Sequence, residues 1–264
     1  MEVKYDKIGT GYNSTRQADP YLTERLFSLL KPQNGKIYLD IGCGTGNYTS
    51  NLADKGIVFF GLDPSEQMLK EAKTRNQRVT WLKGTAEQIT AEDCVFDGAT
   101  ATLTIHHWTD IEKAFIEINR VLAANGKFVL FTSTPEQMKG YWLNHYFPKM
   151  LRESIVQMPS LANIQEALSN TELKITGVEK YFIKDDLQDH FLYVGKNRPE
   201  YYFNEQIRKG ISSFSSLANI DEVKQGLAEL RRDIDNETFE SIKTKYQNDI
   251  GDYLFIMIEK NGSS

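Results

Sequence analysis

The sequence predicts an α/β fold, in which a doubly wound sheet of seven strands carries a helical lid over one edge. Two observations support this prediction. Between residues 36 and 133, short apolar runs alternate with segments of helical periodicity, which is the pattern of strands joined by crossover helices. Farther along the chain, two longer helical stretches interrupt the remaining apolar runs. We expect these two insertions to form the lid.

The bulk composition is that of an ordinary globular protein. The 264 residues suffice for one large domain with a lid, and 40% of them are hydrophobic and 25% charged. The net charge of −5 and the lack of a basic cluster argue against a nucleic-acid partner. Two cysteines, Cys43 and Cys94, make no disulfide framework, so we expect a reduced, cytoplasmic setting. No apolar run is long enough for a bilayer and the first residues lack a signal-peptide core, so no membrane contact is expected.

Residues 1–35 precede the first predicted strand. Leucines at helical spacing predict a helix over residues 20–30. Before it lies a polar, glycine-containing segment with Tyr5, Tyr12 and Arg16. We interpret this segment as a flap over a bound ligand. The alternative interpretation is a solvated N-terminal arm.

The most specific pattern is the turn after the first strand. An apolar run ends at Asp40, glycines follow at positions 42, 44 and 46, and a helix is predicted over residues 47–55. Glycine adopts positive φ without strain and lets a ligand approach the backbone, and the helix start offers free N–H groups. A dinucleotide pyrophosphate prefers the spacing G-x-G-x-x-G, and an acid before the first glycine would repel it. Asp40 suits instead the ammonium of S-adenosylmethionine (SAM), whose sulfur is also cationic. The alternatives are a glycine turn without a ligand and an NAD-dependent dehydrogenase, which the spacing disfavours.

Residues 39–46, Leu-Asp-Ile-Gly-Cys-Gly-Thr-Gly, resemble motif I of the class I SAM-dependent methyltransferases, and the chain resembles the type 11 enzymes that act on small molecules. The resemblance covers the predicted core over residues 36–133. It implies a Rossmann-like sheet, mostly parallel with an antiparallel last strand. It also implies SAM as methyl donor and S-adenosylhomocysteine as product. Gly42 and Gly44 would then contact the cofactor.

The second strand, residues 57–63, ends in an acid. An acid in this position of a βαβ unit accepts hydrogen bonds from ribose hydroxyls, and we predict this role for Asp63. The alternative is that Asp63 caps the helix predicted over residues 65–75. Pro64 and Met68 would border the adenine, although Met68 could equally belong to the core.

The third strand, residues 79–84, leads into a loop. In the family that the chain resembles, this loop holds the adenine edge, often through an aspartate, and Thr85 stands at that place here. Thr85 or Glu87 could supply the oxygen, and the backbone N–H of Ala86 could donate to the ring. Glu87 could instead be an acid in the first turn of a helix.

The fourth strand, residues 96–105, is rich in Thr and Ala, and small residues such as Thr102 would leave room for the methionine end of the cofactor. His106 and His107 follow at its carboxyl end. They are the best candidates for a general base because histidine titrates near neutrality, and only one of two adjacent residues leaving a strand easily faces a pocket. His107 could instead form a wall of the cofactor site, and both could be structural. Trp108 is a candidate substrate contact.

Beyond this point the elements are less regular. A helix is predicted from Asp110 to a stop at Asn125-Gly126, followed by a fifth strand over residues 127–133. The remaining segments are predicted as a lid insertion, a core strand, a second lid insertion and a last strand with its tail: residues 134–168, 169–185, 186–249 and 250–264.

An aromatic patch lies in the first insertion, formed by Tyr141, Trp142, His145 and Tyr146. It is interpreted either as a substrate pocket or as the core of the lid. A metal site is not expected, because no carboxylate or cysteine has ligand spacing with the histidines.

The resemblance also assigns roles to the N-terminal flap. Arg16 would pair with the carboxylate of the cofactor, since its fork suits a carboxylate. Tyr12 would wall the methyl-transfer chamber, and Tyr5 would contact the substrate.

Together these features predict an enzyme that transfers a methyl group from SAM to an O, N or C atom of a small molecule. Alignment and exclusion of water would dominate its in-line displacement. The alternatives are a methyltransferase acting on RNA or protein, and a SAM-binding protein without catalysis. The sequence carries no signal for an oligomeric state.

Overall fold

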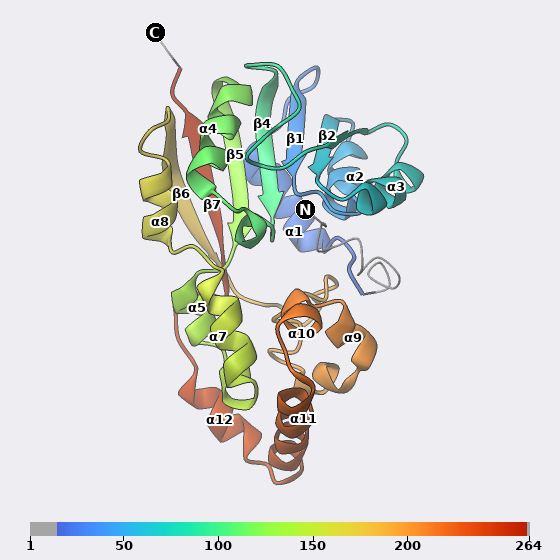
Figure 1. Ribbon diagram of the computed structural model, residues 1–264, viewed down its shortest axis with the longest axis vertical. Helices are drawn as coiled ribbons and strands as arrows, with labels where there is room; N and C mark the ends of the chain where they lie inside the picture. The colour runs from blue at the N-terminus through green and yellow to red at the C-terminus, as the bar shows by residue number, and fades with distance from the viewer. Residues whose placement is uncertain (1–14, 263–264) are drawn as a thin grey trace.

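The computed structural model describes residues 15–262, which form a seven-stranded sheet with helices on both faces and a group of helices below one edge (Figure 1). Tyr5 and Tyr12 lie outside the described residues. The strand order is β3-β2-β1-β4-β5-β7-β6. The strands are β1 (Ile37–Ile41), β2 (Val58–Asp63), β3 (Thr80–Lys83), β4 (Phe96–Thr102), β5 (Leu122–Thr132), β6 (Leu173–Tyr181) and β7 (Tyr253–Lys260).

Strands β1 to β5 pair in parallel, and β7 runs antiparallel to both of its neighbours, β5 and β6. The predicted fold class is therefore confirmed. The order of strands reverses between β1 and β4, where the carboxyl ends of open α/β sheets bind ligands.

The helices around the sheet follow the predicted order. They are α1 (Pro20–Leu30), α2 (Asn47–Ala53), α3 (Glu66–Arg75), α4 (Ile111–Val121) and α8 (Leu161–Ala167). The sheet separates two hydrophobic clusters formed by described residues. One contains apolar residues of α1 and α2 and continues into the lid, and the other contains those of α4 and α8. Each helix lays its apolar stripe on one face, as a doubly wound fold requires.

Two boundaries differ from the predicted ones. Helix α4 ends at Val121, because Leu122 adopts extended backbone and pairs with Phe96 at the start of β5. The Asn125-Gly126 pair lies inside β5, where Asn125 has a φ of 60° beside a register shift. Strand β4 ends at Thr102 rather than at residue 105.

The helical lid, as we use the term, comprises residues 134–158 and 183–251. Its elements are α5 (Pro135–Lys139), α6 (Leu143–Tyr146), α7 (Pro148–Val156), η4 (Pro199–Phe203), α9 (Glu205–Lys209), α10 (Ser212–Ser216), α11 (Ile220–Asp235) and α12 (Phe239–Lys245). These helices lie below the carboxyl ends of β4 and β5 in Figure 1. Helix α8 falls within the first predicted insertion, but it packs on the sheet beside α4, because Ile164, Ala167 and Leu168 join the cluster on that face.

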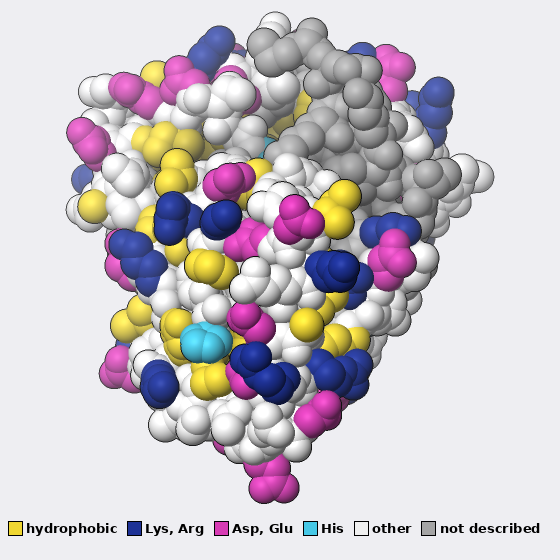
Figure 2. Space-filling model, turned by 60° about the horizontal axis from the view of Figure 1, so that its bottom comes forward, with side chains coloured by type: hydrophobic (Ala, Val, Ile, Leu, Met, Phe, Trp, Pro, Cys, Tyr) yellow, Lys and Arg dark blue, Asp and Glu magenta, His cyan; other side chains and the backbone are white. Residues whose placement is uncertain are grey.

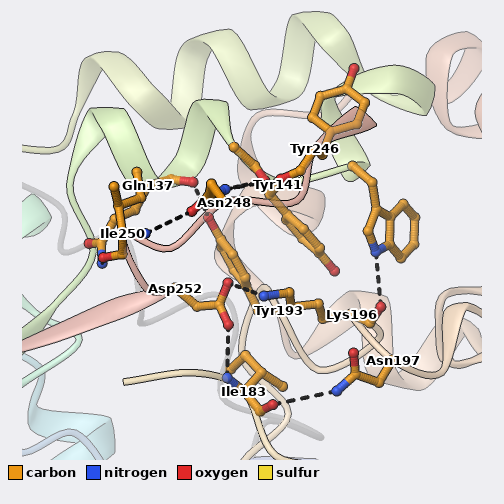
Figure 3. A network of polar contacts seen from close by, with 12 residues as sticks. Gln137, Tyr141, Ile183, Tyr193, Lys196, Asn197, Tyr246, Asn248, Ile250 and Asp252 are labelled. Carbon is orange, nitrogen blue, oxygen red and sulfur yellow. Dashed lines mark hydrogen bonds and ion pairs between the residues drawn. The ribbon is translucent and has the colours of Figure 1, made fainter. Parts of the chain in front are cut away.

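A polar network holds the lid where the chain enters and leaves it (Figure 3). Buried Asp252, just before β7, accepts a hydrogen bond from the backbone of Ile183 at 2.8 Å and pairs with Lys196 at 2.5 Å. The side chain of Gln137 in α5 donates to the carbonyl of Ile250 at 3.2 Å. The network therefore joins three chain crossings between sheet and lid.

None of the helices formed by residues 15–262 is both long and apolar enough to cross a bilayer.

Candidate cofactor site and substrate cavity

The turn after β1 needs glycine at its two ends for steric reasons. Gly42 and Gly46 have φ values of +71° and +73°. A Cβ on Gly42 would come within 2.1 Å of the Thr104 hydroxyl, and one on Gly46 within 2.3 Å of the Trp81 ring. The turn is therefore packed against the loop after β4 on one side and against β3 on the other.

Gly44, at the middle of the turn, is different. Its φ is +54°, and a Cβ at this position would meet nothing within 4 Å among the described residues. Its N–H donates to Asp63 Oδ2 at 2.9 Å. The backbone at Gly44 thus faces space that a ligand can enter, which fits the predicted cofactor.

Asp40 is buried beneath this turn, with 3% of its surface exposed. Its two carboxylate oxygens accept hydrogen bonds from Thr49 at 2.5 Å and from Thr100 at 2.9 Å. Burial raises the pKa of Asp40 to about 6, and the two hydroxyl groups oppose that shift. A cation beside this carboxylate would lower the pKa again, because it favours the charged form.

Asp63 ends β2 and lies beside the turn, 8% exposed. Besides the Gly44 N–H, it accepts the N–H of Ser65 at 2.9 Å. The cap of α3 is the side chain of Ser65, which accepts from Met68 N, so Asp63 is not the helix cap. Pro64 is half-buried, and Met68 is buried on the inner side of α3.

The loop after β3 lies beside the start of α4. Ala86 is buried and Thr85 is exposed. Glu87 accepts from the backbone of Thr109 at 2.6 Å and from its hydroxyl at 3.0 Å. Although burial acts to raise its pKa, these and neighbouring hydrogen bonds hold the pKa of Glu87 below its ordinary value. No helix begins at Glu87 in the described chain, so the interpretation as a first-turn acid is wrong.

Thr102, at the carboxyl end of β4, has a buried hydroxyl that finds no hydrogen-bond partner within residues 15–262. Buried polar atoms are almost always paired, so such an atom beside the glycine turn is consistent with a missing polar ligand.

His106 and His107 lie in η3 (Ile105–His107), a short 3₁₀ helix after β4. Their ring centroids are 3.9 Å apart, and both rings line the same cavity. The expectation that only one of them could face a pocket is wrong, because the chain leaves the strand at Leu103, which has a φ of 55°, and coils. Trp108 does not line this cavity. It packs edge-on against Phe115, on the face of the sheet that α4 covers.

The cavity lies between the sheet edge and the lid, with an empty volume of about 770 Å³ that includes its open mouth. The sheet side contributes the η3 histidines and the ends of β4 and β5. The lid contributes residues of α5, α7 and α10 and of the segment before η4. Lining residues are Arg16, Leu103, His106, His107, Thr132, Ser133, Met138, Ser154, Gln157, Met158, Phe191, Leu192, Ile211, Ser212, Ser213, Leu217 and Tyr253.

Arg16 lines this cavity and is held by the lid. Its Nε donates to Asp189 Oδ1 at 2.5 Å and its Nη2 to Asp189 Oδ2 at 3.2 Å. Asp189 is 1% exposed and also accepts from the hydroxyl of Tyr48 in α2. The backbone carbonyl of Arg16 accepts from Asn47. Arg16 is therefore placed next to the first turn of α2, although its partner in this structure is a protein carboxylate.

The predicted aromatic patch forms the core of the lid. Tyr141, Trp142 and Tyr146 are each at most 2% exposed. Tyr141 hydrogen-bonds Tyr202, and the indole of Trp142 donates to the carbonyl of Lys196 at 2.9 Å. His145 is exposed on the outer side. None of the four lines the cavity, so the structure corrects their assignment to a substrate pocket.

Comparisons with known proteins identify the family of the chain. Residues 39–130 match the family profile described as a methyltransferase domain. A crystal structure from Anabaena variabilis, provisionally described as a methyltransferase from an antibiotic biosynthesis pathway, is 32% identical. The alignment covers 92% of this chain and 98% of that one, with a TM-score of 0.82.

The chain belongs to the class I methyltransferase family.

Other relatives of this methyltransferase share a smaller part or only the fold. An uncharacterized methyltransferase of Mycobacterium bovis is 29% identical over 134 residues, which are 51% of this chain and 55% of that protein. The chain thus spans about half the length of the curated relative it matches. A geranyl diphosphate C-methyltransferase from Streptomyces coelicolor, crystallised with S-adenosyl-L-homocysteine, has a TM-score of 0.56 at 13% identity. That alignment covers 91% of this chain and 75% of the other, and it shows a shared fold.

Sequence analysis of this methyltransferase missed the lid side of its cavity. Phe191 and Leu192 stand in a stretch without a motif, and only the folded chain brings them opposite η3. Asp189, the partner of Arg16, is 173 residues away along the chain. No local pattern distinguishes Asp189 from Asp185 and Asp186, which precede it in the same segment.

Proposed function

We propose that this methyltransferase binds SAM at the carboxyl ends of β1, β2 and β4 and methylates a small molecule held in the cavity below. One observation carries the proposal. The glycine turn, open at Gly44 and flanked by Asp40 and Asp63, packs through Gly42 against Thr104, directly before the η3 histidines that line the cavity. Donor site and cavity are thus neighbours.

In this proposal, different residues around the turn contact different parts of the cofactor. Asp63 accepts from the ribose hydroxyls, and Asp40 favours the ammonium of the methionine part. Pro64, Met68 and the loop Thr85, Ala86 and Glu87 border the adenine. Thr102, Gly42 and Gly44 lie along the methionine chain, with His107 as a wall.

Arg16 supplies the counter-charge for the carboxylate of the cofactor. Its bond to Asp189 uses one edge of the guanidinium, whose five N–H groups allow a second partner. Because Asn47 holds the Arg16 carbonyl, the side chain stays near the first turn of α2.

When bound, SAM supplies a methyl group on a positively charged sulfur. The chain's own contribution is to align the acceptor, exclude water and take up a proton where the acceptor releases one. Alignment of reactants contributes about 7–11 kcal/mol in favourable cases, and a positioned base about two to four powers of ten in rate. His106 and His107 both reach the cavity and are the proposed proton acceptors.

The distribution of charge on the surface and the nature of the cavity both favour a small-molecule acceptor. On the face shown in Figure 2, acidic and basic side chains of the described residues alternate, with no broad basic area. Nucleic-acid partners need such an area because phosphate contacts dominate their affinity. The cavity, by contrast, is lined mainly by apolar side chains with a few polar groups, as small-molecule sites usually are.

Two measurements test the proposal in sequence. Calorimetry should show saturable binding of SAM and of S-adenosylhomocysteine, and no binding of NAD. Chromatography should then detect S-adenosylhomocysteine formed with at least one member of a panel of small acceptors. Failure to bind SAM would refute the proposal. Binding without turnover by any acceptor, and unaffected by mutation of both histidines, would favour a non-catalytic SAM-binding protein.

A further inference from the structure

We propose that the cavity accepts an uncharged, largely apolar molecule carrying an oxygen atom that receives a hydrogen bond from Ser213. This inference rests on the proposed function insofar as that molecule is the methyl acceptor. It concerns the chemical class of the ligand, which the family membership leaves open.

The walls of the cavity are apolar over most of their area. Met138 and Met158 of the lid face it together with Phe191, Leu192 and Leu217. Methionine adapts its shape and packs favourably on aromatic rings, and a phenylalanine offers a ring face or edge. Such walls favour a ring system or another broad apolar body.

The charges around the cavity are balanced before any ligand enters. Apart from the η3 histidines, Arg16 is the charged residue among the described residues that line it. Its guanidinium forms a two-point contact with buried Asp189, so the pair carries no net charge. None of the lining residues within 15–262 is an Asp or Glu. A cationic acceptor would therefore find no counter-ion among the described lining residues, and an anionic one would have to compete with Asp189 for Arg16; burial of an unpaired charge is strongly unfavourable.

Ser213 supplies a polar contact on the lid side. It lies in α10, 7% exposed, and its hydroxyl oxygen accepts a hydrogen bond from Ser154 at 2.8 Å. A hydroxyl has one hydrogen to donate, and that of Ser213 finds no acceptor within the described part of the chain. Both serines line the cavity. Ser154 thus orients Ser213 so that its O–H can donate to a ligand oxygen.

The test uses ring-matched probes rather than an unknown substrate. 2-Naphthol, 2-methylnaphthalene, 2-naphthoate and 2-naphthylmethylammonium share one apolar body and differ in polar group and charge. Their affinities for the protein saturated with S-adenosylhomocysteine are measured by calorimetry. We expect 2-naphthol to bind most tightly and both charged probes at least about tenfold more weakly, given the unfavourable burial of an unpaired charge.

Mutation separates the role of Ser213 from apolar packing. Ser213→Ala should weaken 2-naphthol about five- to tenfold, the size of one hydrogen bond, and leave 2-methylnaphthalene within about twofold. Ser216→Ala, on the exposed side of the same helix, should change neither. Ser154→Ala keeps the Ser213 hydroxyl and serves as a second variant if Ser213→Ala fails to fold, with an expected smaller loss for 2-naphthol alone.

Each outcome bears on the proposal. Equal losses for both neutral probes, a charged probe binding as tightly as 2-naphthol, or no binding of any neutral probe would overturn it. Because the same titrations are run with and without S-adenosylhomocysteine, the two proposals fail separately. A protein that binds 2-naphthol but not S-adenosylhomocysteine loses the proposed function and keeps the assigned ligand class.

Discussion

At the scale of single residues, the site depends on two carboxylates in different surroundings. Asp40 lies under the turn and touches two hydroxyl groups, whereas Asp63 lies at its side and holds two backbone N–H groups. Hydrogen bonds to backbone N–H favour an ionised carboxylate, and burial without a cation disfavours it. The two acids are therefore expected to respond differently to pH and to mutation.

The pKa of about 6 at Asp40 predicts a pH-dependent affinity for SAM. In the free protein, ionising Asp40 lowers folding stability as the pH rises from 3.8 through about 6. A cation bound nearby favours the ionised form, so affinity should fall as the pH is lowered from 7 to 5, by at most about tenfold per unit. Calorimetry at three pH values measures this slope.

The variant Asp40→Asn provides the control for that slope. It should bind SAM more weakly at pH 7 and lose most of the pH dependence. A slope of the same size in the variant would assign the effect to other groups and contradict the role of Asp40.

Asp63→Ala should weaken SAM about tenfold or more, because a charged hydrogen bond contributes roughly 1.5–3 kcal/mol. Asp54→Ala is the matched control: Asp54 ends α2 and pairs with Arg78 on the surface, away from the turn. Equal SAM affinity of the two variants in calorimetry would rule out a ribose contact at Asp63.

At the scale of elements, some glycines of the strand–turn–helix unit are needed for packing of the fold and another for binding of the ligand. Gly46 and Gly42 pack against neighbouring side chains, and Gly44 faces space. Gly56, in the loop after α2, also has positive φ, +86°, and nothing within 4 Å of its Cβ position among described residues. Gly44 and Gly56 thus both adopt a left-handed backbone conformation, but only Gly44 belongs to the proposed cofactor site.

These glycines make a prediction with an internal control. Gly44→Ala and Gly56→Ala should each lower the unfolding free energy by about 1–2 kcal/mol, the strain of a left-handed conformation. Only Gly44→Ala should weaken SAM binding, because its methyl group occupies the ligand's space. Thermal melts and calorimetry on both variants test this, and equal SAM affinities would place the cofactor elsewhere.

The elements that could be predicted from the sequence are those with a local signal. The glycine turn, Asp63 after an apolar run and the alternation of strands and helices all depend on residues close together in the chain. The lid lacked such a signal. Tyr141 and Trp142 were assigned two roles because an aromatic stripe looks the same in a core and in a pocket. Their burial depends on Tyr202 and Lys196, which lie more than fifty residues later.

At the scale of the whole molecule, sheet and lid are held together by buried polar contacts as well as apolar ones. Asp252 bonds both Lys196 and the chain entering the lid at Ile183. Gly210 packs against Thr15, and Asp189 joins Arg16 to the second insertion. The position of the cavity walls relative to η3 therefore depends on pairs that are distant in sequence, which is why sequence analysis could not place them.

Removing the side chain of Asp252, which links the lid to the sheet at this junction, should lower the stability of the protein and disturb the position of the cavity walls. Asp252→Ala leaves the Ile183 N–H and Lys196 without their partner, which should cost about 2–4 kcal/mol of unfolding free energy. Glu205→Ala removes an exposed pair with Lys209 and should leave the unfolding free energy nearly unchanged. Urea unfolding measures both. Similar small losses in the two variants would mean that the junction does not stabilise the lid.

The place of β7 has a consequence for synthesis. This strand follows the whole lid along the chain, yet it lies between β5 and β6. While the ribosome is still making the second insertion, β5 and β6 each present an unsatisfied edge with no partner to fill the gap between them. In the nascent protein, β7 can pair with β5 and β6 only after residue 260 has left the exit tunnel. Throughout the translation of the lid, the open edges of β5 and β6 can therefore pair with the wrong strand.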